Sequence, residues 1–167
     1  MKELRQMRDA VLRALREGGL AAEAAFPPHW AGEGKTALAT VAVGAAEGKN
    51  IGFSGYLGER EDPSGQVREV YGKRLEGTVT VDVCAQRAAD CEDGGEKAAA
   101  VLLGGLPEGL RPGELSWEGL AWDKKTGLFL RRGRLRCEAL FLAEAGEDGG
   151  VFLDFQLKGA VDSEQHA

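Results

Sequence analysis

The sequence predicts a single α+β domain: a mostly antiparallel β-sheet with an N-terminal amphipathic helix and a second short helix packed on one face. Helical periodicity is confined to two segments, and the strand-like runs follow one another in groups joined by turn sequences. The 167 residues, 43% hydrophobic and 29% charged, are enough for one domain with a core. We expect this domain to span residues 1–161, followed by a polar tail over 162–167.

The first helix is expected over residues 2–17. Gly18 and Gly19 supply a stop at its end. Arginines occupy the positions between its apolar residues. The apolar residues recur at three- and four-residue spacing and form one stripe that packs on the core: Leu4, Met7, Val11, Leu12 and Leu15.

The middle of the chain is expected to contain two strands separated by a long irregular segment. Residues 36–46 are small or β-branched and predict a strand. Residues 52–73 are polar and rich in turn residues, which indicates an excursion with little regular structure. A loop of that length is usually functional or mobile. The next strand is expected over about 68–86.

Strict alternation marks residues 75–85, "LEGTVTVDVCA", as a half-buried strand. The buried side is apolar, and its valines should pack under the helices: Val79, Val81 and Val83. The wet side faces solvent, a substrate or another copy of the chain: Glu76, Thr78, Thr80 and Asp82.

A short second helix is expected to start near Asp90, Glu92 and Asp93, because acidic residues suit the positive end of a helix dipole. Ala98 to Leu103 form its apolar turn, and Gly104 and Gly105 end it. The last third is expected to be β, with strands in 113–123, 127–145 and 151–161. The connections at 124–127 and 146–150 have the composition of hairpin turns.

The bulk composition excludes several classes of protein. A net charge of −6 and a pI of about 5.1 argue against a general nucleic-acid binder. The first helix is charged along its length, so we expect no signal peptide, and no apolar run approaches the roughly 18 residues of a membrane span. The three cysteines are widely spaced, which indicates reduced thiols in a cytoplasm.

No motif in the sequence predicts a reaction. "GEGKT" at 32–36 has His29 where a phosphate-binding loop needs its first glycine, and it opens a strand instead of a helix. Ser54 does not form a nucleophile elbow, because the motif Gly-x-Ser-x-Gly needs a glycine two residues after the serine, and that position is Tyr56. The second histidine, His166, lies in the tail. We therefore expect no enzyme activity, no cofactor and no metal site.

"RRGRLR" at 131–136 is the one dense basic patch, and on a strand Arg132, Arg134 and Arg136 share a face. Two interpretations remain open. The arginines pair with acidic cross-strand neighbours such as those in 114–123. Alternatively, they contact another subunit or line a lumen that contains DNA.

Two tryptophans complete the candidate surface. Trp117 and Trp122 are five residues apart, so on one strand they would lie on opposite faces, leaving one less protected. An exposed tryptophan is a common interface anchor. The candidate assembly or lumen surface consists of Arg132, Arg134, Arg136, Glu76, Thr78, Thr80, Asp82 and Trp117.

The layout of the chain resembles the tail-terminator family of bacteriophages and prophages with long tails. The similarity spans nearly the whole chain and rests on the phrases "MRDAVLRALREGG", "IGFSGYLG", "YGKRLEGTVTVDVCAQ" with the helix after it, and "LRCEALFLAEAGEDGGVFLDFQLKGAV". Segment 44–68 departs from the pattern, because it is long for the simplest members.

The resemblance implies a structural role without a reaction or cofactor. Such proteins form a ring, typically hexameric, on the head-proximal end of the tail tube, where they stop polymerisation and join the tail to head-completion or neck proteins. The partners would be other copies of the chain, the tail-tube protein and the head-completion protein. DNA would pass only transiently through the channel, and no membrane is involved. The protein would be assembled in the bacterial host cytoplasm and end in the virion tail.

Other roles are compatible with the same layout. A neck connector or a baseplate component would use similar contacts. A bacterial α+β binding module outside phages would recognise a protein or a small ligand. An enzyme would need its catalytic groups in 52–73, where no recognisable set occurs.

Overall fold

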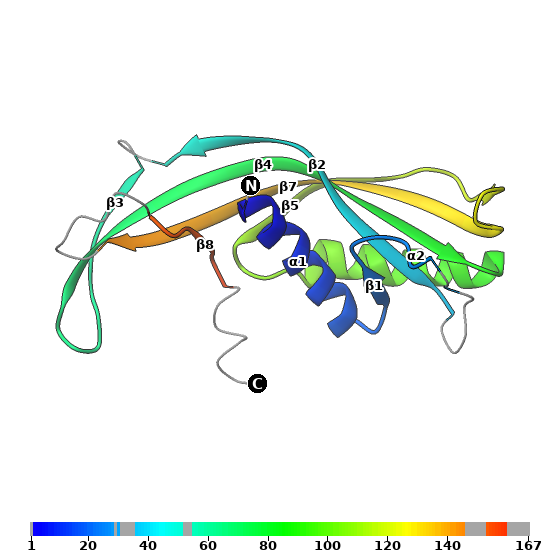
Figure 1. Cartoon of the computed structure of the whole chain (residues 1–167), viewed down its shortest axis with the longest axis horizontal. Coiled ribbons are helices and arrows are strands. Elements are labelled where there is room, and N and C mark those ends of the chain that lie inside the picture. The colour runs from blue at the N-terminus through cyan, green and yellow to red at the C-terminus, as the bar shows by residue number, and fades with distance from the viewer. Residues whose placement is uncertain (1, 29, 31–35, 52–54, 146–152, 160–167) are drawn as a thin grey trace.

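The computed structural model describes residues 2–28, 30, 36–51, 55–145 and 153–159, and it confirms the α+β class (Figure 1). The helices are α1 (Lys2–Glu17) and α2 (Ala88–Gly104). The strands are β1 (Ala21–Glu23), β2 (Leu38–Asn50), β3 (Tyr56–Glu61), β4 (Val67–Ala85), β5 (Leu110–Trp117), β6 (Ala121–Asp123), β7 (Leu128–Ala145) and β8 (Gln156–Leu157).

All the described strands join one sheet, in the order β1-β2-β4-β7-β5, with β3 paired to β4, and β6 and β8 paired to β7. The pairs are antiparallel except for β1 and β2, which run parallel. The sequence analysis missed β1, because three residues carry too little pattern to register as a strand. The side chain of Arg16 holds β1 beneath α1 by donating from Nε to the Ala22 carbonyl at 2.9 Å.

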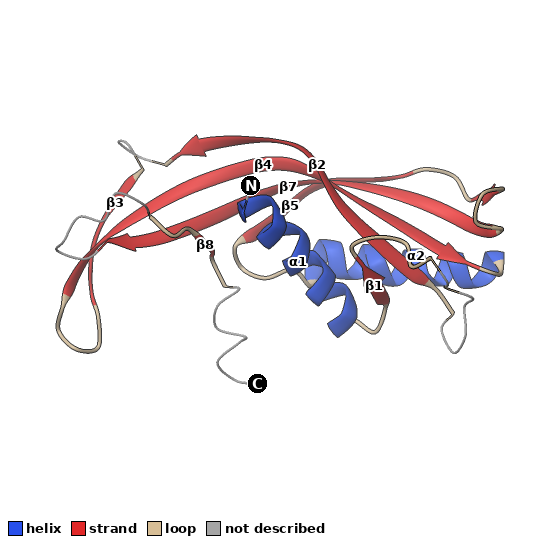
Figure 2. Cartoon of the chain, in the orientation of Figure 1, coloured by secondary structure: helices blue, strands red, loops and turns tan. Residues whose placement is uncertain are grey.

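Both helices pack on the same side of the sheet, as the sequence predicted (Figure 2). The apolar stripe of α1 is buried, and Met7, Val11 and Leu15 are fully inaccessible to solvent. On β4, the predicted buried side is confirmed. The valines at its centre are all 0% exposed: Val79, Val81 and Val83.

The second helix is longer than expected. It covers 17 residues and begins at Ala88, just ahead of the acidic residues where its start was expected, and it ends at Gly104 as expected. Its close approach to the sheet depends on Gly94. A Cβ at Gly94 would lie 2.7 Å from the Ala37 Cβ and 2.9 Å from a Val83 methyl group.

The two longest strands, β4 with 19 residues and β7 with 18, continue well beyond the helices (Figure 1). There the first part of β4 pairs with β3 to form a hairpin, and residues 56–72 are called the arm from here on. The expectation of an irregular excursion over 52–73 is therefore wrong for the described residues, 55–73. The error has a physical cause: polar residues occupy both sides of the hairpin, so no apolar alternation marks its strands.

The turn of the arm is built by Asp62. One oxygen of its carboxylate accepts hydrogen bonds from the backbone N–H groups of Ser64 and Gln66, both at 2.9 Å. Gly65 completes the turn with a φ of 84°, a conformation that favours glycine.

The C-terminal strand is shorter than predicted. A strand was expected over 151–161, but within residues 153–159 only Gln156–Leu157 pair, with Phe141 and Leu142 of β7. Gln6 of α1 fixes this segment: its amide donates to the Phe155 carbonyl at 2.9 Å and accepts from the Leu157 N–H at 2.7 Å. The expected turn at 146–150 and tail at 162–167 lie outside the described residues.

No helix within the described residues combines the length and the apolar character needed to cross a membrane.

Candidate assembly surface

The predicted wet row of β4 and the predicted arginine row of β7 lie side by side on the face of the sheet that points away from the helices, called the outer face from here on. The sequence named both rows but could not supply the register that joins them. That register places one row directly opposite the other. The facing pairs are Thr78–Arg136, Thr80–Arg134 and Asp82–Arg132.

Two of the three arginines are paired within the chain. The guanidinium of Arg132 donates to both carboxylate oxygens of Asp82, from Nε at 2.9 Å and from a terminal nitrogen at 3.1 Å. These hydrogen bonds raise the pKa of Arg132 above its ordinary value. Arg134 forms an ion pair with Glu118 at 2.9 Å. The cross-strand interpretation is therefore confirmed for both, although the partner of Arg132 comes from β4 and not from 114–123.

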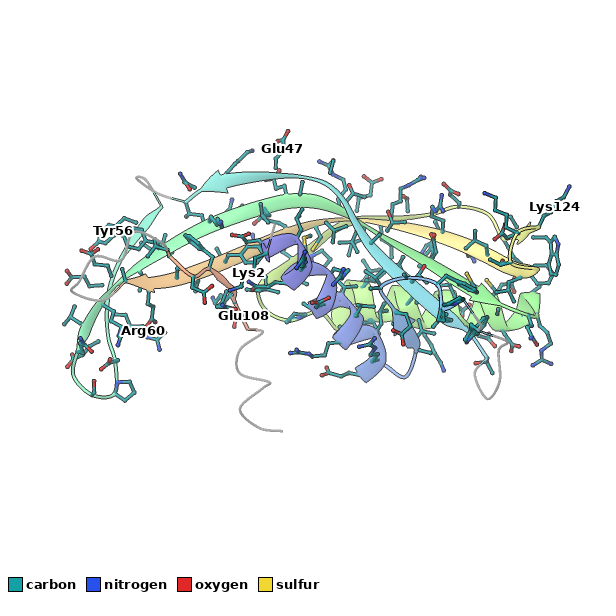
Figure 3. The ribbon with its side chains drawn as sticks, in the orientation of Figure 1. Lys2, Glu47, Tyr56, Arg60, Glu108 and Lys124 are labelled. Carbon is teal, nitrogen blue, oxygen red and sulfur yellow. The ribbon has the colours of Figure 1, made fainter. Side chains whose placement is uncertain are left out.

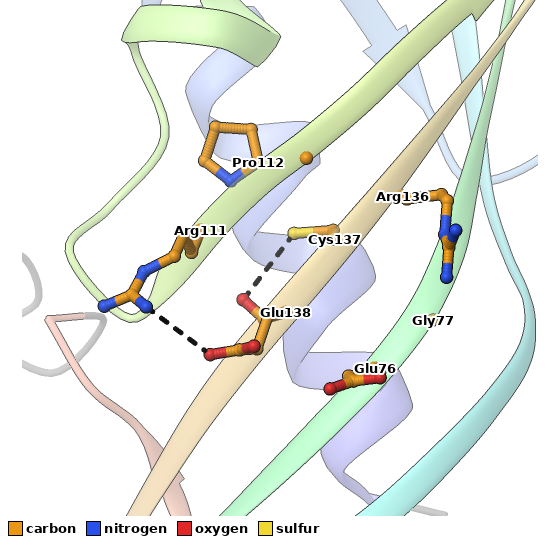
Figure 4. Close-up of a pocket in the computed structure, with 8 residues that line it drawn as sticks. Glu76, Gly77, Arg111, Pro112, Arg136, Cys137 and Glu138 are labelled. Carbon is orange, nitrogen blue, oxygen red and sulfur yellow. Dashed lines mark hydrogen bonds and ion pairs between the residues drawn. The ribbon is translucent and has the colours of Figure 1, made fainter.

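Arg136 has no ion-pair partner among the described residues. It lines a shallow groove of about 190 Å³ on the outer face, together with Glu76, which also makes no ion pair there (Figure 4). The nearby Glu138 is already engaged, by Arg74 at 3.2 Å and Arg111 at 3.8 Å. The groove therefore presents one free cation and one free carboxylate to an incoming partner.

The groove exists because β5 departs from regular pairing beside it. The register with β7 shifts between Pro112 and Leu115, which interrupts the regular pairing of β5 at this point. The remaining wall of the groove comes from small residues and a buried thiol: Gly77, Gly113 and Cys137.

Trp117 does not belong to the outer face. It pairs with Gly133 on the helix side of the sheet, where a Cβ at Gly133 would lie 2.6 Å from its ring. The guanidinium of Arg131 lies 5.8 Å from the centre of the Trp117 ring, and the side chain is partly buried against the core.

The exposed tryptophan is Trp122, which is 54% accessible and packs edge-on against Phe129 at 5.0 Å. Phe129 and Gly133 lie on the same side of β7, so the two tryptophans do not point to opposite faces. That expectation fails because residues 118–120 separate β5 from β6, and a period of two does not carry across the break.

The arm is a second candidate surface, and the sequence analysis did not name its residues. On the helix side of the arm, Tyr56 lies opposite Tyr71, Glu59 opposite Glu69, and Glu61 opposite Val67. The tyrosine rings meet edge-on at 5.7 Å. The sequence signal for the arm is two short segments, "YLGERE" and "VREVYG", on either side of a turn sequence that contains Pro63 and Gly65. This arrangement is typical of a β-hairpin.

The arm also exposes apolar side chains of a size normally buried. Tyr56 is 42% exposed, Leu57 44% and Val67 46%. The Tyr71 hydroxyl donates to the Glu69 carboxylate at 2.7 Å, and this hydrogen bond raises the pKa of the tyrosine.

The three thiols are buried and poorly ionised. Burial raises the pKa of Cys84 to about 12 and that of Cys137 to about 11, and it also raises the pKa of Cys91. Among the described residues, no group of three or more His, Cys, Asp or Glu could hold a metal ion. The chemistry that the described surfaces offer is ion pairing and aromatic contact.

No protein-family model matches the chain, and no curated protein matches it. Among solved structures, the chain is similar to one from the virion of a native gene transfer agent particle, with 20% sequence identity and a TM-score of 0.34. The match covers 81% of this chain and 90% of that chain. A likeness at this level carries no argument about function.

Proposed function

We propose that this chain is a structural component of a phage or phage-like tail and acts as its terminator. In this role, copies form a ring on the head-proximal end of the tail tube, stop its polymerisation and present a surface to the head-completion proteins. The proposal is supported by the resemblance in sequence layout. The described chain has the expected N-terminal amphipathic helix, antiparallel sheet and intervening helix.

The observation that carries the proposal is the unequal coverage of the sheet. The helices bury one half, whereas the arm continues the same strands with exposed tyrosine, leucine and valine side chains. A monomer gains little by keeping such a surface in water. A ring covers it, because each copy contributes two different patches and the contact repeats until it closes.

The proposed role needs neither a reaction nor a cofactor. The groups that would act are contact groups, above all Arg136 and Glu76 on the outer face and the tyrosines of the arm. A net charge of −6 fits a channel through which DNA passes without adhering. Acidic side chains repel phosphates and cannot replace the counterions that surround DNA.

The first test is the assembly state of the purified full-length chain, by native mass spectrometry and negative-stain imaging. We expect a closed ring, hexameric as in the family it resembles, with a central channel. A strict monomer at every concentration would contradict the proposal and favour a bacterial binding module.

The second test separates a terminator from a neck connector or baseplate component. The ring would be added to the polymerising tail-tube protein encoded near it. A terminator should bind tube ends and shorten the tubes in proportion to its concentration. Tubes of unchanged length with no ring at their ends would reject this role while leaving other virion roles open.

A further inference from the structure

We propose that the helix side of the arm is the docking surface for helix α1 of a second copy of this chain. This inference rests on the proposed function, since it identifies the contact that would build the ring. The arm face consists of Tyr56, Glu59, Glu61, Val67, Glu69 and Tyr71. The opposing surface is the basic stripe of α1, which consists of Arg5, Arg8, Arg13 and Arg16.

The arm face starts where the chain's own helix layer stops. Glu3, in the first turn of α1, forms an ion pair with Lys73 of β4, just beyond the arm. Towards the turn from Lys73, no described helix covers the sheet; Tyr56 and Arg60 lie along this stretch, on the left of Figure 3. A helix from a second copy would therefore continue the helix layer over the uncovered part and cover its exposed Tyr56 and Val67 side chains.

The arm is acidic, and its carboxylates are in excess of its cations. Residues 56–72 hold four acidic and two basic side chains. Arg68 is engaged by Asp62 at 3.4 Å, and Arg60 by Glu144 of β7 at 3.5 Å. The carboxylates of Glu59 and Glu61 have no ion-pair partner among the described residues.

Helix α1 is basic in an acidic protein. Its 16 residues contain five Lys and Arg against three Asp and Glu. Arg5 is exposed and makes no ion pair within the described part of the chain. Arg8 and Arg16 are held by Asp9 at 2.8 Å and Glu23 at 3.3 Å, partly exposed pairs that are weak enough to exchange for new partners.

The two surfaces match in chemistry as well as in charge. Guanidinium groups stack on tyrosine rings and bind carboxylates, and the arm face offers both. The patches lie on different parts of the molecule, so the contact is heterologous and can propagate around a ring.

The test compares two charge reversals, Arg5→Glu and Glu59→Arg, with the double variant and the unmodified chain. Both side chains are exposed. Glu59→Arg also removes a like-charge pair, since Glu59 lies opposite Glu69, so the variant should fold at least as well. Lys124→Glu is the matched control for Arg5→Glu, because it also replaces a positive with a negative charge, at the other end of the molecule (Figure 3).

Assembly would be followed by native mass spectrometry across a dilution series, with circular dichroism as a check of folding. We expect each single reversal to weaken the contact about fivefold to tenfold, with the double variant restored towards the unmodified chain and the control unchanged. A ring that is insensitive to the single reversals, or a double variant that is not restored, overturns this inference and leaves the proposed function standing. An unmodified chain that never assembles overturns both.

Discussion

One strand, β4, passes through two different environments, and the contrast separates the part of the molecule that folds from the part that binds. Under the helices, its inward side is valine and fully buried. In the arm, the same side carries Val67, Glu69 and Tyr71, which no described helix covers. Backbone pairing with β7 runs unbroken from Glu69 to Ala85, so only the side-chain environment changes. We infer that the free energy of unfolding resides in the covered half, whereas the arm serves assembly.

The largest expected effect tests this division directly. Phe141→Ala, at a fully buried position, should lower the free energy of unfolding by about 3–5 kcal/mol because it removes core contacts and leaves a cavity. Tyr56→Ala in the arm should cost no more than about 1 kcal/mol. Urea denaturation of the dissociated chain would measure both. Similar costs for the two variants would contradict the comparison.

A sharper test uses neighbouring glycines of α2. Gly94→Ala should lower the free energy of unfolding by about 1–3 kcal/mol, because the added Cβ would overlap Ala37 and Val83. Gly95→Ala should raise the free energy of unfolding by about 1 kcal/mol, because alanine favours helix more than glycine does. The added Cβ fits there, since the nearest atom, in the Arg131 side chain, lies at an ordinary 3.7 Å. Thermal unfolding should therefore shift in opposite directions. Equal shifts would mean that α2 is not packed closely on the sheet.

The free energy of unfolding should depend on pH through the ion pair between Glu3 and Lys73, which lies at the boundary between the two halves. The ion pair with Lys73 lowers the pKa of Glu3 below its ordinary value of 4.5. A carboxyl group whose folded pKa is lowered stabilises the fold above its unfolded pKa, and this contribution is lost as the pH falls through the folded pKa.

Glu3→Gln should therefore be less stable than the unmodified chain at neutral pH, and the difference should fade as the solution is acidified below the ordinary pKa. Denaturation curves across the acidic range would show this. Glu47→Gln, at an exposed position of β2, is the control and should differ little at either pH. A difference for Glu3→Gln that persists in acid would mean that the ion pair is not its source.

The smallest expected change in stability separates two arginines of the outer face, Arg132, which is paired within the chain, and Arg136, which makes no ion pair among the described residues. Arg132→Ala should cost up to about 1 kcal/mol of stability, because it leaves Asp82 without its partly exposed partner. Arg136→Ala should leave stability unchanged, since Arg136 makes no ion pair among the described residues, and it should affect only association. Denaturation curves and assembly measurements on both variants would separate these roles. A loss of stability in Arg136→Ala would indicate an intramolecular role.

The sequence was most informative where one side of an element is buried. The stripe of α1 and the alternation of 75–85 predicted a helix and a strand whose described bounds agree closely with the expectation. Both rows of the outer face were named as well. Their register was not accessible, because the facing residues of the two rows, such as Asp82 and Arg132, lie fifty or more positions apart in the sequence.

The failures share a physical cause, the absence of a one-sided pattern. In the arm, polar residues occur on both sides of the hairpin, and β1 and β8 are too short to show a period. The two tryptophans were misplaced because a break between strands interrupts the alternation.

Hydrogen exchange of the full-length chain at low and high concentration tests the central claim most directly, because it compares the two regions in one measurement. We predict that amides of residues 56–72 exchange more slowly when the chain assembles. Amides of the helix-covered part of β4, residues 77–85, should be slow at both concentrations. Exchange in the arm that does not depend on concentration, in a chain that assembles, would show that the arm is not the contact between copies.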